Sequence, residues 1–155
     1  MNVYEAVLNR RTVRKFTDKA ISGDMLLRII DCARLTAYGA NMQPLKFMTI
    51  TDEDLLNSIF PLTKWAGYLS DGTPKENERP TAYFAIIGDS TIKANRAYET
   101  EAGAAAAVMA LEATELGLGS CQLGAINRPA ISQLLELNEK YDLLYLLALG
   151  YPAQT

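Results

Sequence analysis

The hydrophobic positions in the first third of the chain follow helical spacing twice and then strand spacing. Asn2 and Glu5 have the spacing of a capping box, which predicts a short helix that ends at about Arg10. Ser22 begins a second helix, whose apolar residues recur every three or four positions until the chain bends at a Tyr-Gly pair. The next run, over 46–51, is short and apolar and is typical of a buried strand.

Helices and strands continue to alternate in the rest of the chain. We expect, in order, a helix capped by Asp52, a surface loop over 67–80, a strand over 82–88, a long helix over 98–116, a strand over 120–123, a helix capped by Asn127 and a strand over 141–149. The long helix carries many alanines, which permit neighbouring elements to approach it closely. The pattern therefore predicts a single α/β or α+β domain over 1–155, without linkers or repeats.

Composition and charge narrow the environment and the partners. A chain of 155 residues with 49% hydrophobic side chains can bury a real core. No apolar run approaches the ~20 residues needed to span a bilayer, and the amino terminus has no apolar stretch with a small-residue cleavage site. We therefore expect a cytoplasmic protein that does not contact membranes. The net charge of −3 gives no general attraction to polyanions, so nucleic acid is not an expected partner.

The chain contains no histidine, and this excludes several classes of enzyme. Ser-His-Asp and Cys-His catalysis and His-ligated zinc all need an imidazole as base or ligand. The two cysteines, Cys32 and Cys121, have no CxxC spacing and are interpreted as reduced, buried thiols rather than as a disulfide or a metal site. Difficult chemistry in this chain would have to be carried by a cofactor.

The first candidate binding segment is RRTVRKF, residues 10–16, directly after the first predicted helix. Arg10, Arg11 and Arg14 offer forked guanidinium groups and Thr12 offers a hydroxyl, and donors of this kind converge on a phosphate. The same residues also suit a solvated helix end, because basic side chains interact favourably with the helix dipole. The residues alone leave both interpretations open.

The second candidate is the bend YGANMQP, residues 38–44, between the second helix and the first strand. Asn41 and Gln43 each offer paired donors and acceptors, such as a flavin pyrimidine edge requires. Gly39 lets the backbone approach a flat ring closely. An ordinary polar loop explains the same composition, so this interpretation also stays open.

The third candidate is GLGSCQLG, residues 117–124. A dinucleotide-binding glycine loop follows a strand and has a third glycine, whereas this segment follows a helix and has Gln122 at that position. What remains is a short strand that ends at Leu123 and Gly124, whose backbone amides can reach a ligand at the end of the strand. Helix termination followed by strand packing is the alternative.

Taken together and in this order, these segments resemble the nitroreductase family of flavoenzymes. The resemblance covers essentially the whole chain, and it rests on RRTVRKF, GANMQP, PTAYFAIIGD, GLGSCQLG and LLALGYP. It implies an α+β fold, a three-layer α/β/α sandwich, built as an intertwined homodimer with two FMN molecules at the interface. The long alanine-rich helix would then form the core of the dimer.

The resemblance also implies which residues bind the cofactor. Arg10, Arg11, Thr12 and Arg14 would hold the phosphate, the ribityl chain and the pyrimidine edge. The partner subunit would contact the isoalloxazine ring through Tyr38, Gly39, Asn41 and Gln43. The backbone amides of Leu123 and Gly124 would lie near the flavin N5. Lys64 and Trp65 are considered as further neighbours of the flavin, although a packed tryptophan beside a solvated lysine is the preferred interpretation.

Two departures from the family pattern change what we expect. The bend usually carries proline and serine where this chain has Ala37 and Tyr38, so the hydroxyl contact at that position is not expected. Family members also usually continue past the last strand into an arm that supplies another basic residue to the phosphate, whereas this sequence ends at Thr155. We therefore expect weaker FMN binding and a weaker dimer.

The activity that the resemblance implies is electron transfer from NADH or NADPH, through FMN, to a small nitro compound, quinone or similar acceptor. No catalytic side chain and no metal ligand is assigned, because the cofactor carries the chemistry. Two alternatives stay open. One is a non-catalytic module that binds flavin and dimerises, and the other is a branch of the family with different flavin chemistry, such as dehalogenation or flavin fragmentation.

Overall fold

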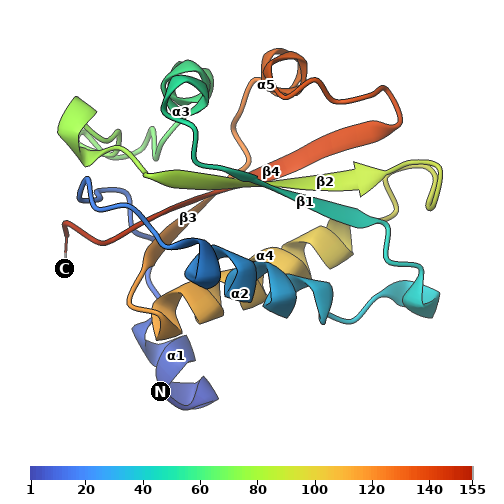
Figure 1. Cartoon of the computed structure of the whole chain (residues 1–155), viewed down its shortest axis with the longest axis horizontal. Coiled ribbons are helices and arrows are strands. Elements are labelled where there is room, and N and C mark those ends of the chain that lie inside the picture. The colour runs from blue at the N-terminus through green and yellow to red at the C-terminus, as the bar shows by residue number, and fades with distance from the viewer. Residues whose placement is uncertain (155) are drawn as a thin grey trace.

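A four-stranded antiparallel sheet lies at the centre of the protein in a computed structural model that describes residues 1–154 (Figure 1). The helices are α1 (Val3–Asn9), α2 (Gly23–Arg34), α3 (Glu53–Ile59), α4 (Glu99–Glu115) and α5 (Arg128–Leu134), and the strands are β1 (Leu45–Ile50), β2 (Ala82–Asp89), β3 (Gly119–Leu123) and β4 (Tyr141–Gly150). Single 3₁₀ turns are η1 (Gly39–Asn41), η2 (Phe60–Leu62) and η3 (Glu76–Glu78). Every helix and strand that the sequence predicts is present, with its ends shifted by a few residues at most.

The helices begin where the sequence predicts because their caps are local. The Asn2 side chain accepts a hydrogen bond from the Glu5 amide at 2.9 Å, and the Glu5 carboxylate accepts one from the Asn2 amide at 3.0 Å, which completes the capping box of α1. Ser22, Asp52 and Asn127 each accept a hydrogen bond from the amide three residues later. Each cap satisfies an amide that the first helical turn leaves without a partner.

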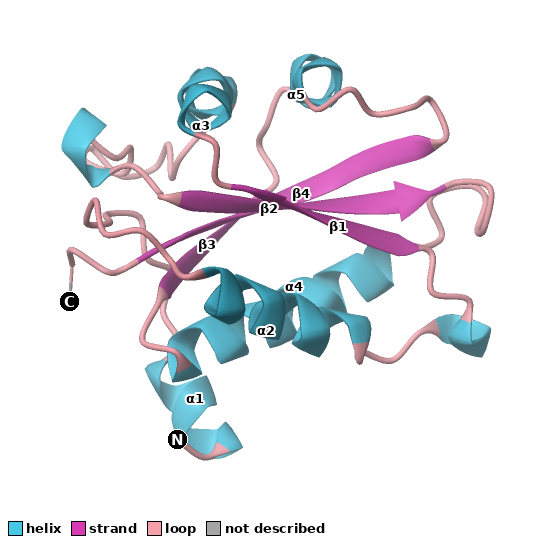
Figure 2. Cartoon of the chain, in the orientation of Figure 1, coloured by secondary structure: helices cyan, strands magenta, loops and turns pink. Residues whose placement is uncertain are grey.

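The sheet has the strand order β1-β2-β4-β3 and is covered on both faces (Figure 2). Helices α2 and α4 lie on one face, and α3 and α5 lie on the other. All of β2 is buried, and its side chains alternate between the two layers: Phe84 and Ile86 pack with α2 and α4, and Tyr83, Ala85 and Ile87 pack on the opposite side. The predicted three-layer α+β architecture is therefore confirmed.

The segment 67–80 is a surface loop, as expected, and several of its residues are anchored to the body of the protein. It contains the turn η3, and its Gly72, Pro74 and Pro80 are buried. A side chain at Gly72 would lie 2.6 Å from the Ala66 carbonyl oxygen, so only glycine fits where the chain folds back on itself. The loop thus packs against the body of the protein instead of extending from it.

The longest helix, α4, is apolar around most of its circumference. Ala102, Ala105, Ala106, Met109 and Ala113 face the sheet and α2 and are buried. The opposite side of the helix carries small apolar residues as well, including the exposed Ala104 and Ala107. None of the described helices combines the length and the apolar character needed to cross a membrane.

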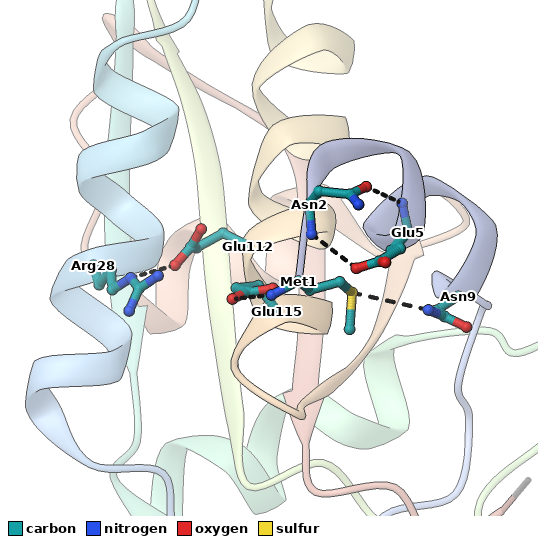
Figure 3. A network of polar contacts seen from close by, with 7 residues as sticks. All are labelled: Met1, Asn2, Glu5, Asn9, Arg28, Glu112 and Glu115. Atoms are coloured by element: carbon teal, nitrogen blue, oxygen red, sulfur yellow. Dashed lines mark hydrogen bonds and ion pairs between the residues drawn. The ribbon is translucent and has the colours of Figure 1, made fainter.

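Helix α1 is fastened to the end of α4 by its first residue (Figure 3). The amino group of Met1 forms an ion pair with Glu115 at 3.1 Å, and one turn earlier on α4 Glu112 pairs with Arg28 of α2. Of the α1 side chains only Ala6 is buried. The ion pair and the burial of Ala6 together join α1 to α4.

Candidate functional site

The segment after α1 runs along the outer edge of β3. Thr12 forms a parallel bridge with Ser120, and the Val13 amide donates to the Ser120 carbonyl at 2.9 Å. Gly119 makes this approach possible, because a side chain there would lie 2.6 Å from the Val13 Cβ. The arginine segment 10–14 is thus brought to the end of the glycine-containing strand.

The carboxyl-terminal segment supports the other side of the same stretch. Phe16 forms an antiparallel bridge with Pro152, and its ring lies against Gly150, where a Cβ would come within 2.7 Å of it. The Gln154 side-chain oxygen accepts hydrogen bonds from the Arg14 amide at 3.0 Å and from the Lys15 amide at 2.8 Å. The backbone that carries the arginines is therefore held between β3 and the end of the chain.

The three arginines of this segment carry charge that no carboxylate among residues 1–154 neutralises. Among residues 1–154, none of the ion pairs involves Arg10, Arg11 or Arg14, whereas Arg28 and Arg34 each pair with a carboxylate. The Arg11 guanidinium donates to the carbonyl oxygens of Leu8 and Arg10 at 2.6 and 2.9 Å, and Arg14 donates to the Tyr68 hydroxyl at 3.1 Å. Guanidinium groups that have no acidic partner among the described residues are suited to bind a phosphate or another anion.

Two cavities flank Thr12. One, of about 360 Å³, lies between α4 and the edge of β3 and combines small apolar with polar side chains. Its lining residues are Val7, Arg10, Thr12, Ala106, Ala107, Ala110, Leu111, Ser120, Gln122 and Leu147. The other, of about 580 Å³, lies toward the end of α4 and includes Arg11 and Gly117. A cavity with an apolar wall and a few polar groups is typical of a small-molecule site.

The outer edge of β3 is free beyond Thr12. Because the Ser120 carbonyl points away from β4, the alternation of an antiparallel ladder turns the amides of Gln122 and Gly124 toward the same edge. Neither amide donates a hydrogen bond to a loop or cap within residues 1–154. The Leu123 side chain, in contrast, is buried in the core. The edge therefore presents the amides of Gln122 and Gly124. The expectation that the Leu123 amide reaches a ligand there is wrong, because the same alternation turns that amide toward β4.

The bend 38–43 lies at the opposite end of α4 (Figure 1). The Gly39 amide donates to Glu101 in the first turn of α4, whereas Arg10 and Thr12 line a cavity with Ala107 and Ala110 further along the helix. Within one copy of the chain, the bend does not approach the arginine segment.

A sequence model of the Nitroreductase family matches residues 7–151. The chain belongs to the nitroreductase family. Its fold agrees with solved structures of that family. A nitroreductase family protein from Clostridium novyi NT has a TM-score of 0.85 at 24% identity, over 99% of this chain and 87% of that one.

Two further proteins resemble the chain more closely in sequence. A Desulfovibrio desulfuricans protein whose crystal structure was solved in complex with FMN is 28% identical, with a TM-score of 0.83 over 99% of this chain and 88% of that one. An oxygen-insensitive NADPH nitroreductase from Salmonella typhimurium is 27% identical over 96% of this chain and 65% of its own length. The nitroreductase fold that the sequence implies is therefore shown.

The predicted site residues fall into two groups in this chain. Six lie on the arginine segment or at the end of β3, namely Arg10, Arg11, Thr12, Arg14, Leu123 and Gly124. Four lie in the distant bend, namely Tyr38, Gly39, Asn41 and Gln43. One flavin could contact both groups only if the bend came from a second copy of the chain.

Some residues near the site were missed by the sequence analysis. Tyr68 contacts Arg14 but lies in a loop whose course no periodicity predicts, and Gln154 acts on backbone 140 residues away. Ser120 and Gln122 were noted only as parts of a strand, yet both line the smaller cavity. The alternation of side chains along β3 was the one signal available for Gln122, which is exposed.

Trp65 does not line the two cavities that flank Thr12. It is buried, its indole N–H donates to the Thr63 hydroxyl at 2.8 Å, and its ring lies near Phe60. Lys64 is exposed, and its backbone amide donates to the Ala125 carbonyl at 2.9 Å. The preferred interpretation of this pair, a packed tryptophan beside a solvated lysine, is confirmed.

Of the two cysteines, Cys121 is buried as predicted, whereas Cys32 is only half-buried. Both are free thiols, and no cluster of potential metal ligands occurs in the described part of the chain. Cys121 is buried on β3, and burial raises its pKa to about 11 although Arg14 acts in the opposite direction. Cys32 is half-buried on α2, and burial together with Glu112 raises its pKa too. Protonated thiols are poor nucleophiles at neutral pH.

Proposed function

We propose that this protein is an FMN-dependent oxidoreductase that passes electrons from NADH or NADPH to a small nitro compound, quinone or similar acceptor. The observation that carries the proposal is the group of three arginines at the outer edge of β3, none of which has an acidic partner among residues 1–154. Family membership supports the cofactor, since a relative with 28% identity was solved in complex with FMN. The name of the Salmonella relative supports the electron donor and the class of acceptor.

The donor set fits the chemical groups of FMN. Arg10, Arg11 and Thr12 would hold the phosphate and the ribityl chain, and Arg14 would lie at the pyrimidine edge. The Arg10 guanidinium has no hydrogen-bond or ion-pair partner among residues 1–154, so it can take a phosphate without breaking an internal contact. The Gly124 amide, on the free edge of β3, would donate to the ring.

The chain has no histidine, so the cofactor rather than the protein would carry the redox chemistry. When bound, FMN supplies hydride transfer and electron storage. Arg14 would stabilise negative charge on the pyrimidine side, and the amides of Gln122 and Gly124 would orient the ring. Cys121 stays protonated at neutral pH, because burial raises its pKa to about 11, and takes no part. The protein binds, orients and stabilises charge, and it does little proton transfer of its own.

We also propose that one domain spanning the whole chain works as a homodimer. The four site residues of the bend lie too far from the arginine segment of the same copy, so a second copy has to bring them. The apolar outer side of α4 and the exposed α1 side chains Val3, Tyr4, Val7 and Leu8 offer the surface that such a partner would cover.

The proposal is tested by the visible spectrum of the purified protein. We expect bands of bound oxidised flavin that bleach when NADH or NADPH is added without oxygen and return when a quinone or nitroaromatic compound follows. The double variant Arg10→Ala/Arg14→Ala should lose FMN affinity by about tenfold or more, because each charge-assisted hydrogen bond contributes roughly 1.5–3 kcal/mol. Its matched control is Arg34→Ala, which breaks an exposed ion pair with Asp31 and should bind FMN normally.

The outcome also separates the alternatives. A protein that does not bind added FMN would overturn the proposal. Bound flavin that no nicotinamide reduces would favour a non-catalytic flavin-binding module. A bleached flavin whose only products are dehalogenated compounds or flavin fragments, identified by mass spectrometry, would favour a different branch of the family.

A further inference from the structure

Glu101 is a buried carboxylate that the proposed chemistry does not use. It lies in the first turns of α4 and is only 7% exposed. One carboxylate oxygen, Oε1, accepts hydrogen bonds from the Lys93 ammonium at 2.9 Å and from the Gly39 amide at 2.9 Å. The other oxygen, Oε2, is buried without a partner among the described residues. Burying a charge is costly unless its contacts compensate, so this arrangement calls for an explanation.

The segment that Glu101 holds has an unfavourable backbone. Ala40, Asn41 and Gln43 have φ of 50°, 53° and 52°, in the left-handed region that residues with a side chain rarely adopt. Such conformations persist only where the surrounding structure holds them, and they concentrate at functional sites. The Gln43 amide donates to the Asn41 side-chain oxygen at 3.3 Å, but both residues are exposed and give little support by themselves.

Contacts to the body of the protein occur at the start of the bend. The Tyr38 hydroxyl donates to the Ala33 carbonyl at 3.2 Å, and the Gly39 amide donates to Glu101. A Cβ at Gly39 would lie 3.2 Å from Glu101 Oε1, which is tight, so glycine lets the carboxylate come close. Beyond Gly39, the backbone enters the left-handed stretch directly. The bond to Glu101 is therefore the last contact with α4 before the strained residues.

We propose that Glu101 is a positioning residue that holds the bend 38–43 in the conformation in which Asn41 and Gln43 contact the FMN bound by a second copy of the chain. This inference rests on the proposed function. Glu101 does not touch the cofactor, and it acts through the Gly39 amide and through the left-handed residues that follow. Lys93 balances its charge and fixes the direction of the carboxylate.

The groups around Glu101 decide its ionisation. Burial raises the pKa of Glu101, but the hydrogen bonds from Lys93 and from the Gly39 amide outweigh burial and bring the pKa below its ordinary value. The carboxylate is therefore charged at neutral pH and can only accept hydrogen bonds. Alanine at this position would leave both the Lys93 ammonium and the Gly39 amide without their partner, whereas glutamine would keep an acceptor for Gly39.

The experiment compares Glu101→Ala and Glu101→Gln with Glu99→Gln. Glu99 is the matched control, because it lies two residues earlier on α4 and pairs with Arg96 in an ion pair whose partners are both about half exposed. The first readout is hydrogen exchange of the peptide 36–44 in the protein without FMN. The second is the dissociation constant for FMN, from quenching of flavin fluorescence.

We expect Glu101→Ala to speed exchange of the peptide 36–44 and to raise the dissociation constant by about tenfold or more, while exchange of β2 stays unchanged. Glu101→Gln should give a smaller change in both readouts, and Glu99→Gln should give none. A dissociation constant of Glu101→Ala within about twofold of the wild type, or unchanged exchange over 36–44, would overturn the inference.

Two further comparisons keep the test decisive. Should circular dichroism show that Glu101→Ala does not fold, Lys93→Met and Glu101→Gln take its place, and both must loosen the bend and weaken FMN binding for the inference to stand. Failure of the wild type itself to bind FMN would contradict the proposed function. Wild-type binding that the Glu101 variants retain in full would contradict only the positioning role.

Discussion

Cys121 shows at the scale of one residue how burial removes reactivity. Its thiol lies on β3 next to the arginine segment. Burial raises the pKa of this thiol to about 11 although the positive charge of Arg14 acts to lower it, so very little thiolate exists at neutral pH.

We therefore expect iodoacetamide to modify Cys121 at least about tenfold more slowly in the folded protein than in urea, because both burial and protonation protect the sulfur. The measurement is mass spectrometry of peptides after timed labelling at neutral pH. Cys32, which is half-buried, serves as the internal comparison and should react faster than Cys121. Equal rates for Cys121 in the folded and unfolded chain would show that the thiol is accessible.

The pKa of Glu101 sets a pH dependence for the bend. The groups that face its carboxylate are the Lys93 ammonium, the Gly39 amide and the Tyr38 phenol, and the net effect lowers the pKa in the folded state. A lowered pKa contributes stability that is present above the unfolded-state value, about 4.3 for glutamate, and is lost as the pH falls below it.

Hydrogen exchange over 36–44, corrected for the intrinsic pH effect, should therefore increase as the pH falls through that range and below. In Glu101→Gln the corrected rate should stay flat over the same range, because no charge is lost. A wild-type profile that matches the glutamine variant would mean that ionisation of Glu101 does not support the bend.

At the scale of elements, two glycines decide how the arginine segment meets the sheet. Gly119 on β3 faces Val13, and Gly150 at the end of β4 faces Phe16, with no space for a Cβ at either position. The segment 10–16 can therefore lie directly on the backbone of the edge strand, where its donors and those of β3 come together.

Gly119→Ala should destabilise the protein by about 1–3 kcal/mol and should also weaken FMN binding, because the new methyl group displaces Val13 and with it Arg14. Thermal unfolding and flavin titration measure the two effects. The control is Gly23→Ala in the first turn of α2, where a Cβ meets nothing within 4 Å, so stability should stay the same or rise slightly. A Gly119 variant as stable as the wild type would show that the segment can move away without cost.

At the scale of the whole molecule, the bend and the arginine segment lie on different sides of the protein (Figure 1). The bend contacts Glu101 in the first turn of α4, whereas Arg10 and Thr12 line a cavity with residues further along the helix. The site is therefore expected to be complete only in a dimer, and binding and assembly should fail together.

Ala104→Glu should shift the protein from dimer to monomer and abolish FMN binding, because Ala104 is exposed on the outer side of α4 and a buried charge would oppose association. Light scattering after size exclusion gives the mass. The control is Gln133→Glu, an exposed position on α5 at the other face of the sheet. A monomeric variant that still binds FMN at wild-type affinity would contradict a shared site.

Mixing two defective variants tests the same point directly. Homodimers of Arg10→Ala/Arg14→Ala and of Asn41→Ala/Gln43→Ala should each bind FMN poorly. Heterodimers formed by unfolding and refolding them together should regain one complete site and bind about one FMN for two chains, because all four changes then fall in the other site. No recovery in verified heterodimers would mean that both groups of residues do not serve one site across the interface.

Much of the local structure was predictable from the sequence. The caps at Asn2, Ser22, Asp52 and Asn127 were read correctly, because a cap joins residues three positions apart. The strands followed from short apolar runs, and the alternation along β3 follows from strand geometry alone. The resemblance of five ordered segments pointed to the family that the comparison of residues 7–151 establishes.

Only the tertiary structure decided which of these elements meet. The antiparallel order β1-β2-β4-β3, the docking of Thr12 on Ser120, and the support of Arg14 by Gln154 join residues up to 140 positions apart. The burial of Trp65 and the hydrogen bond from the Gly39 amide to Glu101 likewise depend on packing between distant segments. Sequence alone determined the helices, the strands and the set of donors, because neighbours along the chain specify these. The geometry of the site depends on long-range contacts, which no local pattern encodes.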